Sequence, residues 1–183
     1  MRLIRSLLFI AFGGISVAIG ALLVLLTFWA PSSVHWAITV GYCRLAVWAG
    51  RFFCGMDPVV EGLENLPDEP SVIMIKHRST KETYWHVTVF PKTAWVIKRE
   101  VMYVPLLGWA MKLMLDPIFI NRRAGRSAVK QVIEQGKDKL DAGIWVTIFP
   151  EGTRMPPGET RRYGVSGVAR ARDARGKIGP VAP

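Results

Sequence analysis

The first hydrophobic pattern in the chain is an uncharged stretch over residues 7–30. A helix of about 24 residues rises roughly 36 Å, which is enough to cross a bilayer. A signal peptide is the alternative for such a start. However, this apolar run is longer than the usual signal-peptide core, and no small-x-small cleavage site closes it. We therefore expect a retained membrane helix.

A second apolar segment, residues 34–56, differs from the first because it contains charges. Arg44 and Arg51 are seven residues apart and so share one helical face. Trp36 and Trp48 are of the residue type that favours the membrane interface. The pattern fits a helix lying in the interface, or a second membrane helix whose arginines snorkel to the headgroups. The flanking basic residues leave the orientation open, and a hairpin re-entering the cytoplasmic leaflet is a further alternative.

Residues 57–70 break this apolar pattern with three prolines and several acidic side chains. Such a change in composition indicates a junction. At 183 residues the chain has room for one domain with a full core, but not comfortably for two. We therefore expect a membrane anchor over residues 1–56 and a separate domain over residues 57–183.

Beyond the junction, short apolar runs alternate with helical patterns. We expect strands at residues 72–75, 93–97, 117–120 and 144–149. One apolar helix should follow Tyr103 and cover 104–115. Another should be capped by Ser127 and end just before Gly143. This alternation predicts an α/β domain with a mixed, largely parallel sheet flanked by helices and preceded by one or two membrane helices.

The amino-acid composition limits the kinds of molecule that this chain could bind. Half of the residues are hydrophobic and the formal net charge is +10, which calls for nucleic acid or an anionic membrane leaflet. The tryptophans lie mostly in apolar runs rather than among basic residues, so we expect lipid and no nucleic acid. Cys43 and Cys54 have apolar neighbours and no paired spacing, which argues against a disulfide or a zinc site. We expect both to be buried, and the main domain to occupy a reducing compartment.

The first predicted strand is followed by residues that suit proton transfer. His77 would lie at its C-terminal end, where open α/β sheets bind their ligands. A neutral imidazole is a natural base near pH 7, and a carboxylate such as Glu82 can fix its tautomer. Ser79 and Glu82 also have the spacing of a helix capping box, which is the alternative role for Glu82.

Two further strands end in polar groups of complementary kinds. The third runs into Arg122 and Arg123, and the fourth into Glu151, Gly152 and, after Thr153, Arg154. Guanidinium groups bind phosphate bidentately, and glycine lets a backbone approach a ligand. Each group taken singly is also typical of a solvated turn. If the strands are neighbours, their ends converge.

Together, these blocks resemble the glycerolipid acyltransferase family that includes 1-acylglycerol-3-phosphate acyltransferase. Residues 77–82 are similar to the family's His-x-x-x-x-Asp block, with Glu82 in place of the aspartate, so the histidine must sit differently or the pair is weakened. Residues 116–122 (Asp-Pro-Ile-Phe-Ile-Asn-Arg) and 149–154 (Phe-Pro-Glu-Gly-Thr-Arg) are similar to the second and third blocks. The resemblance extends from about Val59 to the last residue.

The fourth block of the family, a strand rich in Val, Pro and Ile, is represented only by residues 178–183. The resemblance therefore implies a catalytic domain that is incomplete at its C-terminus. Glutamate at position 82 and this early end motivate one alternative, an inactive membrane-tethered relative that binds lipid. A second alternative is an acyltransferase for another lysophospholipid.

The resemblance implies transfer of a fatty acyl group from acyl-CoA or acyl-carrier protein to the free hydroxyl of 1-acylglycerol-3-phosphate, giving phosphatidic acid. It implies the following roles: His77 as general base oriented by Glu82, Arg122 and secondarily Arg154 on the acceptor phosphate, and Glu151 with Gly152 at the glycerol end. No metal or permanently bound cofactor is expected, because a thiolate leaves readily. We expect the enzyme at the cytoplasmic (inner) membrane, with its catalytic domain facing the cytoplasm.

Overall fold

A five-stranded parallel sheet forms the centre of the computed structural model, which describes residues 2–57, 59–156, 159 and 178–181. Its strands are β1 (Val72–Ile75), β2 (Thr93–Lys98), β3 (Ile118–Ile120), β4 (Trp145–Ile148) and β5 (Ile178–Val181). They lie in the order β3-β2-β4-β1-β5, and each pairing among them is parallel. The predicted α/β class and the four predicted strands are confirmed. The fifth strand pairs with β1 at the edge, where a proline such as Pro180 is tolerated.

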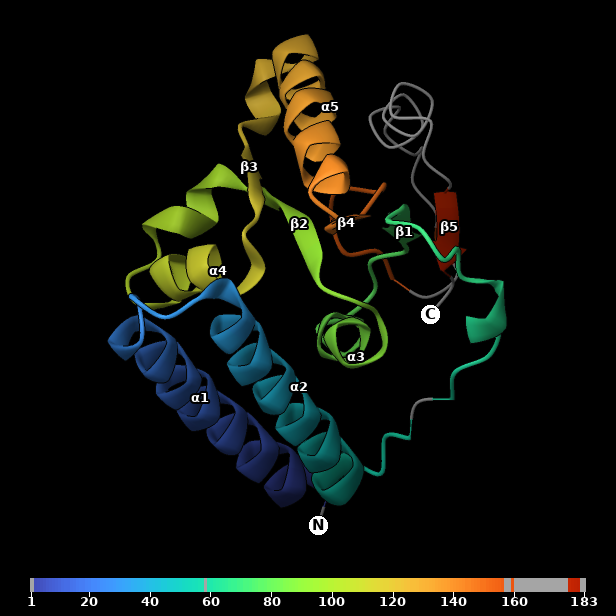
Figure 1. Ribbon diagram of the computed structural model, residues 1–183. Helices are drawn as coiled ribbons and strands as arrows, with labels where there is room; N and C mark the ends of the chain where they lie inside the picture. The colour runs from blue at the N-terminus through green and yellow to red at the C-terminus, as the bar shows by residue number, and fades with distance from the viewer. Residues whose placement is uncertain (1, 58, 157–158, 160–177, 182–183) are drawn as a thin grey trace.

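Alternate residues of β1 point to opposite faces of the sheet, as a strand requires. Val72 packs with Val132 of helix α5 (Arg126–Asp141), whereas Ile73 packs with Phe90 beside helix α3 (Lys81–Val89). In Figure 1, α5 and α3 accordingly lie on opposite sides of the strands. Burying each large aliphatic side chain in these two clusters contributes about 1.5–3 kcal/mol. The two apolar layers hold β1 and β4 side by side and so set the positions of their ends.

Helices α1 (Arg2–Leu26) and α2 (Ser32–Cys54) form a hairpin against the α/β unit (Figure 1). Tyr42 of α2 meets Tyr84 of α3 edge to face, with ring centroids 5.6 Å apart. Val24 of α1 packs with Ala110 of α4 (Leu107–Leu115). Within the described residues, α1 alone is long and apolar enough to cross a membrane, and only 11% of its apolar window is buried.

Three local predictions were wrong. Helix α5 begins at Arg126 after Gly125, with no side-chain cap, so Ser127 lies inside its first turn. Helix α4 begins at Leu107 rather than at residue 104, because a short 3-10 helix (η2, Arg99–Tyr103) and Pro105 precede it. Cys43 is buried as expected, but Cys54 is exposed. Apolar residues near the end of α2 face outward rather than into a core.

Candidate active site

His77 and Glu82 form a hydrogen-bonded pair at the C-terminal end of β1. The side chain of His77 lies two residues beyond the strand, and its Nδ1 is 2.9 Å from Glu82 Oε1. An ionised carboxylate can only accept, so Nδ1 carries the proton and Nε2 is left with its lone pair. The ring of Phe149, at the end of β4, lies against the imidazole with centroids 4.3 Å apart. This arrangement is that of an oriented general base.

The same carboxylate of Glu82 also organises the turn into α3. It accepts from the backbone N–H groups of Arg78 (2.7 Å) and Ser79 (2.7 and 2.8 Å) and from the Ser79 hydroxyl (2.6 Å). In return, Ser79 Oγ accepts from the Lys81 N–H at 3.1 Å. Helix α3 begins at Lys81 with Thr80 as its N-cap and no side-chain cap bond, so the predicted Ser79–Glu82 capping box does not form at the helix start. The Glu82 carboxylate instead ties the turn before α3 to the imidazole of His77.

Glu82 is held in its charged form by these donors. Burial alone would raise the pKa of Glu82, but hydrogen bonds from His77 and from the side chain and backbone of Ser79 outweigh it. The pKa of this carboxyl is lowered to about 2. Glu82 is thus a carboxylate throughout the physiological range, which is the state that orients a neutral imidazole.

His86, a residue that the sequence patterns did not single out, is a core residue of α3. It is 1% exposed, stacks on Phe90 with centroids 4.6 Å apart, and places Nε2 3.0 Å from the Thr147 hydroxyl. Burial lowers the pKa of His86 to about 3. We therefore assign it a neutral structural role beneath the sheet.

We expect the protein to lose stability steadily as the pH falls from about 7 to 3. The unfolded chain protonates His86 near pH 6.5 and Glu82 near 4.5, whereas the folded chain resists until about 3 and about 2. The unfolded state therefore binds more protons in this window, so stability decreases on acidification. Glu82 alone would contribute on the order of 3 kcal/mol. Chemical unfolding at a series of pH values measures the slope, and a flat profile between pH 6.5 and 3 would contradict both assignments.

Glu151 lies against the backbone of His77. It follows β4 directly after Pro150 and is 4% exposed. Its Oε2 accepts the backbone N–H of His77 at 3.1 Å, and its Oε1 lies 3.8 Å from Lys76 Nζ. The Met155 N–H donates to the His77 carbonyl at 2.9 Å. Glu151 of the third sequence block and Met155, which directly follows that block, therefore hold the main chain of His77 on both sides.

Gly152 and Arg154 lie in the same turn. Gly152 has a φ of 69°, a left-handed conformation that glycine adopts without strain. The exposed Arg154 donates from Nη2 to the Thr80 hydroxyl at 3.2 Å, immediately before α3. The turn thus brings a guanidinium group to the residues that carry the His77–Glu82 pair.

The end of β3 is further away. Arg122 begins a short 3-10 helix (η3, Arg122–Ala124), in which the Asn121 side chain caps the Arg123 N–H at 3.0 Å. Because β2 and β4 lie between β3 and β1, about 14 Å of strand spacing separates their ends. The predicted convergence therefore holds for β1 and β4, but β3 is not their neighbour. Among the described residues, no group of three His, Cys, Asp or Glu side chains could hold a metal ion.

Sequence patterns missed three contributors to this site: Lys76 beside Glu151, the Phe149 ring on the imidazole, and the Met155 N–H. The sequence does contain a signal for Lys76, because a charged side chain directly after a buried strand needs an oppositely charged or hydrogen-bonding partner. The other two depend on how the strands pair, which the sequence does not state.

Comparison with known proteins identifies the family of this chain. The model of the Acyltransferase family matches residues 57–183. The chain is 43% identical over 145 residues to a 1-acyl-sn-glycerol-3-phosphate acyltransferase of Pseudomonas aeruginosa, covering 79% of this chain and 56% of that one. It is 31% identical over 137 residues to the protein of the same name from Saccharomyces cerevisiae, covering 73% and 44%. The chain therefore spans about half the length of these relatives.

A solved structure shares the fold. The crystal structure of the 1-acyl-sn-glycerophosphate acyltransferase PlsC from Thermotoga maritima superposes with a TM-score of 0.72 and 24% sequence identity. The match covers 97% of this chain and 73% of that one. The hairpin and the α/β unit are thus similar to those of a known architecture.

Proposed function

Because this chain belongs to the acyltransferase family, we propose that it transfers a fatty acyl group to the free hydroxyl of 1-acyl-sn-glycerol 3-phosphate. The proposed donor is a thioester of coenzyme A or acyl-carrier protein, and the product is phosphatidic acid. The observation that carries the proposal is the 2.9 Å contact between His77 Nδ1 and Glu82, which leaves Nε2 able to accept a proton. The Pseudomonas aeruginosa and Saccharomyces cerevisiae relatives are 1-acyl-sn-glycerol-3-phosphate acyltransferases by name, which supports the choice of acceptor.

In the proposed reaction, Nε2 of His77 takes the proton of the acceptor hydroxyl, and the oxygen of that hydroxyl attacks the carbonyl carbon of the thioester. Glu82 stabilises the imidazolium that forms. The tetrahedral intermediate then expels the thiolate as the carbon–sulfur bond breaks, and the imidazolium returns its proton to the sulfur. The new ester and the free thiol balance the reaction.

The acceptor's phosphate needs a cationic partner, and we assign this role to Arg122 and Arg154. Arg154 is exposed and lies beside the turn that carries the dyad. Arg122 follows the C-terminal end of β3, on the same side of the sheet as the dyad but separated from it by β2 and β4.

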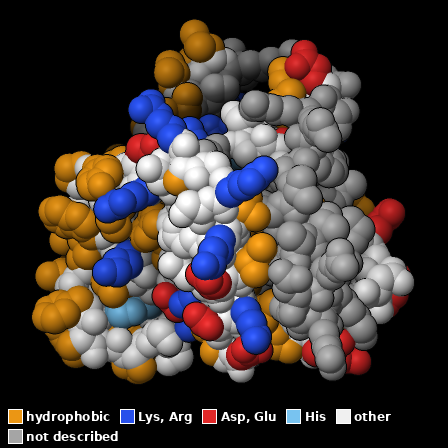
Figure 2. Space-filling model, turned by 90° about the horizontal axis from the view of Figure 1, so that it is seen from above, with side chains coloured by type: hydrophobic (Ala, Val, Ile, Leu, Met, Phe, Trp, Pro, Cys, Tyr) orange, Lys and Arg blue, Asp and Glu red, His pale blue; other side chains and the backbone are white. Residues whose placement is uncertain are grey.

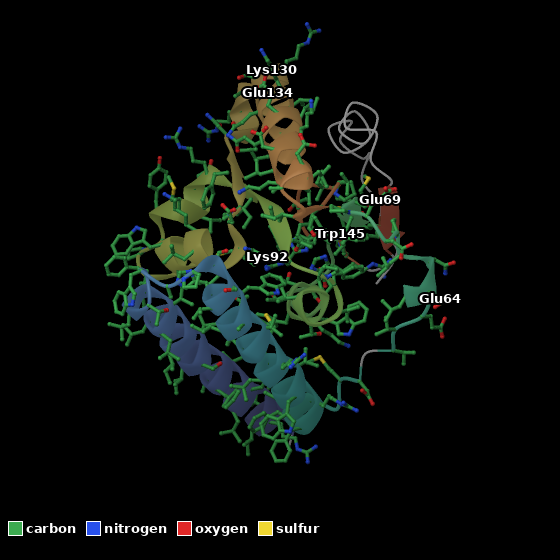
Figure 3. All side chains as sticks on the ribbon, in the orientation of Figure 1. Glu64, Glu69, Lys92, Lys130, Glu134 and Trp145 are labelled. Atoms are coloured by element: carbon green, nitrogen blue, oxygen red, sulfur yellow. The ribbon has the colours of Figure 1, made fainter. Side chains whose placement is uncertain are left out.

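One assay tests the proposal. The protein in lipid vesicles would be incubated with lysophosphatidate and labelled acyl-CoA or acyl-carrier protein, and labelled phosphatidate would be measured. Product formed with another lysophospholipid only would assign a different acceptor. No product with any acceptor or donor would favour an inactive lipid-binding relative. Lys130 on the outer side of α5, whose Nζ lies 3.6 Å from Glu134 Oε1, offers a surface control, and Lys130→Ala should transfer normally (Figure 3).

For the acceptor site, Arg122→Ala should raise the KM for lysophosphatidate roughly 10- to 100-fold, since a charge-assisted contact contributes about 1.5–3 kcal/mol. A neutral monoacylglycerol should be much less affected. Arg123→Ala is the matched control from the adjacent position. Steady-state kinetics with both acceptors measure the difference, and equal losses on the two would make Arg122 structural.

We also propose that the apolar exterior of α1 attaches the protein to lipid. Exposed leucines and isoleucines line α1, and Phe28, Trp29 and Trp109 extend the apolar surface to the α1–α2 turn and α4. Figure 2 shows hydrophobic side chains gathered on the side of the molecule where Figure 1 places α4 and this turn. Aromatic residues suit the interface, and co-flotation of the full chain with vesicles tests the attachment.

A further inference from the structure

Glu151 occupies a position that acceptor binding does not explain. Its side chain is fully shielded from solvent, and one oxygen is already committed to the backbone N–H of His77 at 3.1 Å. The other oxygen, Oε1, is buried without a hydrogen-bond partner, and Lys76 Nζ lies 3.8 Å away. A buried carboxylate is costly unless it is paired with a cation. The function of this carboxylate must therefore be sought inside the protein.

Lys76 is placed to supply the missing charge. It lies between the last residue of β1 and His77, and its side chain is only 17% exposed. Two groups that directly follow β1 thus meet the same carboxylate of Glu151. They are the ammonium of Lys76 and the main-chain N–H of His77. Because β1 and β4 are paired neighbours, this contact joins the two strand ends that carry the proposed base and the third sequence block.

From these contacts we infer that Glu151 and Lys76 are a positioning pair, which fixes the main chain of His77 so that its imidazole stays aligned with Glu82. This inference rests on the proposed acyltransferase function, and it replaces the expected contact of Glu151 with glycerol. Glu151 acts through His77 and touches neither substrate. Lys76 anchors the Glu151 carboxylate through the opposite charge that lies 3.8 Å from Oε1.

The pair can be tested by a double-substitution cycle on the full chain. Glu151→Gln keeps an oxygen that can accept the His77 N–H but removes the charge, and Lys76→Met removes the opposite charge. Each single variant leaves one uncompensated buried charge, so kcat should fall roughly 10- to 100-fold, the range expected when a catalytic group is misplaced by about 1 Å. The KM for lysophosphatidate should stay within about twofold, because acceptor contacts are intact.

The double variant Lys76→Met with Glu151→Gln distinguishes positioning from independent roles. It leaves no unpaired charge, so we expect kcat to return to within about fivefold of the parent. Lys76→Arg should behave like the parent. Lys92→Met is the matched lysine control. Lys92 directly precedes β2, at the N-terminal ends of the strands rather than at the C-terminal ends that carry His77, and its Nζ donates to the Ser32 hydroxyl (Figure 3).

A chemical readout separates this inference from the proposed function. Of the three histidines, His35 and His86 are 3% and 1% exposed, whereas the His77 side chain is 19% exposed, so diethyl pyrocarbonate should modify His77 first. Both single variants should react several-fold faster than the parent, and the double variant at the parent rate. This pattern supports the pair even if no acyl acceptor is found.

Three outcomes would overturn the pair: a raised KM with unchanged kcat in Glu151→Gln, losses that multiply in the double variant, or single variants that match the parent in both kcat and modification rate. If neither single variant folds, the double variant decides alone. A folded double variant with parental kcat supports the pair, and a folded one with kcat lost refutes it.

Discussion

Replacing His77 with alanine should lower acyl transfer about 100- to 10,000-fold, the contribution typical of a positioned general base. The residue lies beyond the end of β1 and is partly exposed, so its removal leaves the two apolar layers of the sheet intact. Folding and vesicle attachment should therefore be unchanged. Initial rates with lysophosphatidate and acyl-CoA, together with a thermal unfolding curve, measure both parts of the prediction.

His77→Ala must be compared with a variant that loses an imidazole elsewhere. His86→Gln serves, since His86 is buried beneath the sheet and is assigned no catalytic role. We expect this control to lose stability rather than chemistry, so its kcat per folded molecule should stay near that of the parent. A His77→Ala protein that still turns over within about threefold of the parent would remove the base from this site.

The strands and the principal site residues are predictable from the sequence because each depends on local information. The apolar run before His77 is short and continuous, as expected for a strand buried on both faces, and β1 covers the predicted residues. The pairing of His77 with Glu82 also follows from the sequence, because five residues of separation allow a turn to bring them together.

Features that depend on strand order are not predictable in this way. The sequence indicates that three strands end in polar groups, but it does not indicate that β2 and β4 separate β3 from β1. For the same reason, the burial of Glu151 against His77 could not be foreseen, and the pattern Glu-Gly-Thr favoured a ligand-facing turn. The exposure of Cys54 has a different cause, since the composition of an apolar helix does not show which of its residues pack against the rest of the protein.

Substitution of Glu82 by glutamine should impair both the base and the turn that carries it. Four donors converge on this carboxylate: His77 Nδ1–H, the N–H groups of Arg78 and Ser79, and the Ser79 hydroxyl. An amide has one acceptor oxygen and an NH₂ group that would face other donors. We expect kcat to fall at least about 100-fold, and the protein to be destabilised by about 1–3 kcal/mol. The acid-dependent loss of stability below pH 4.5 should also become shallower.

The Glu82→Asp variant distinguishes the expectation from the family's sequence pattern from the expectation based on the hydrogen-bond distances in this structure. The family's first block has aspartate at this position, which predicts that the aspartate variant retains or gains activity. In this structure the glutamate oxygens lie 2.6–2.9 Å from their donors, so there is little slack. Shortening the side chain by one methylene moves the carboxylate by roughly 1.5 Å, and a misplacement of about 1 Å can lower a rate 100-fold. We therefore expect Glu82→Asp to lose about 10- to 100-fold in kcat with an unchanged KM. Activity equal to or above that of the parent would show that the turn at Arg78 and Ser79 adjusts to the shorter side chain.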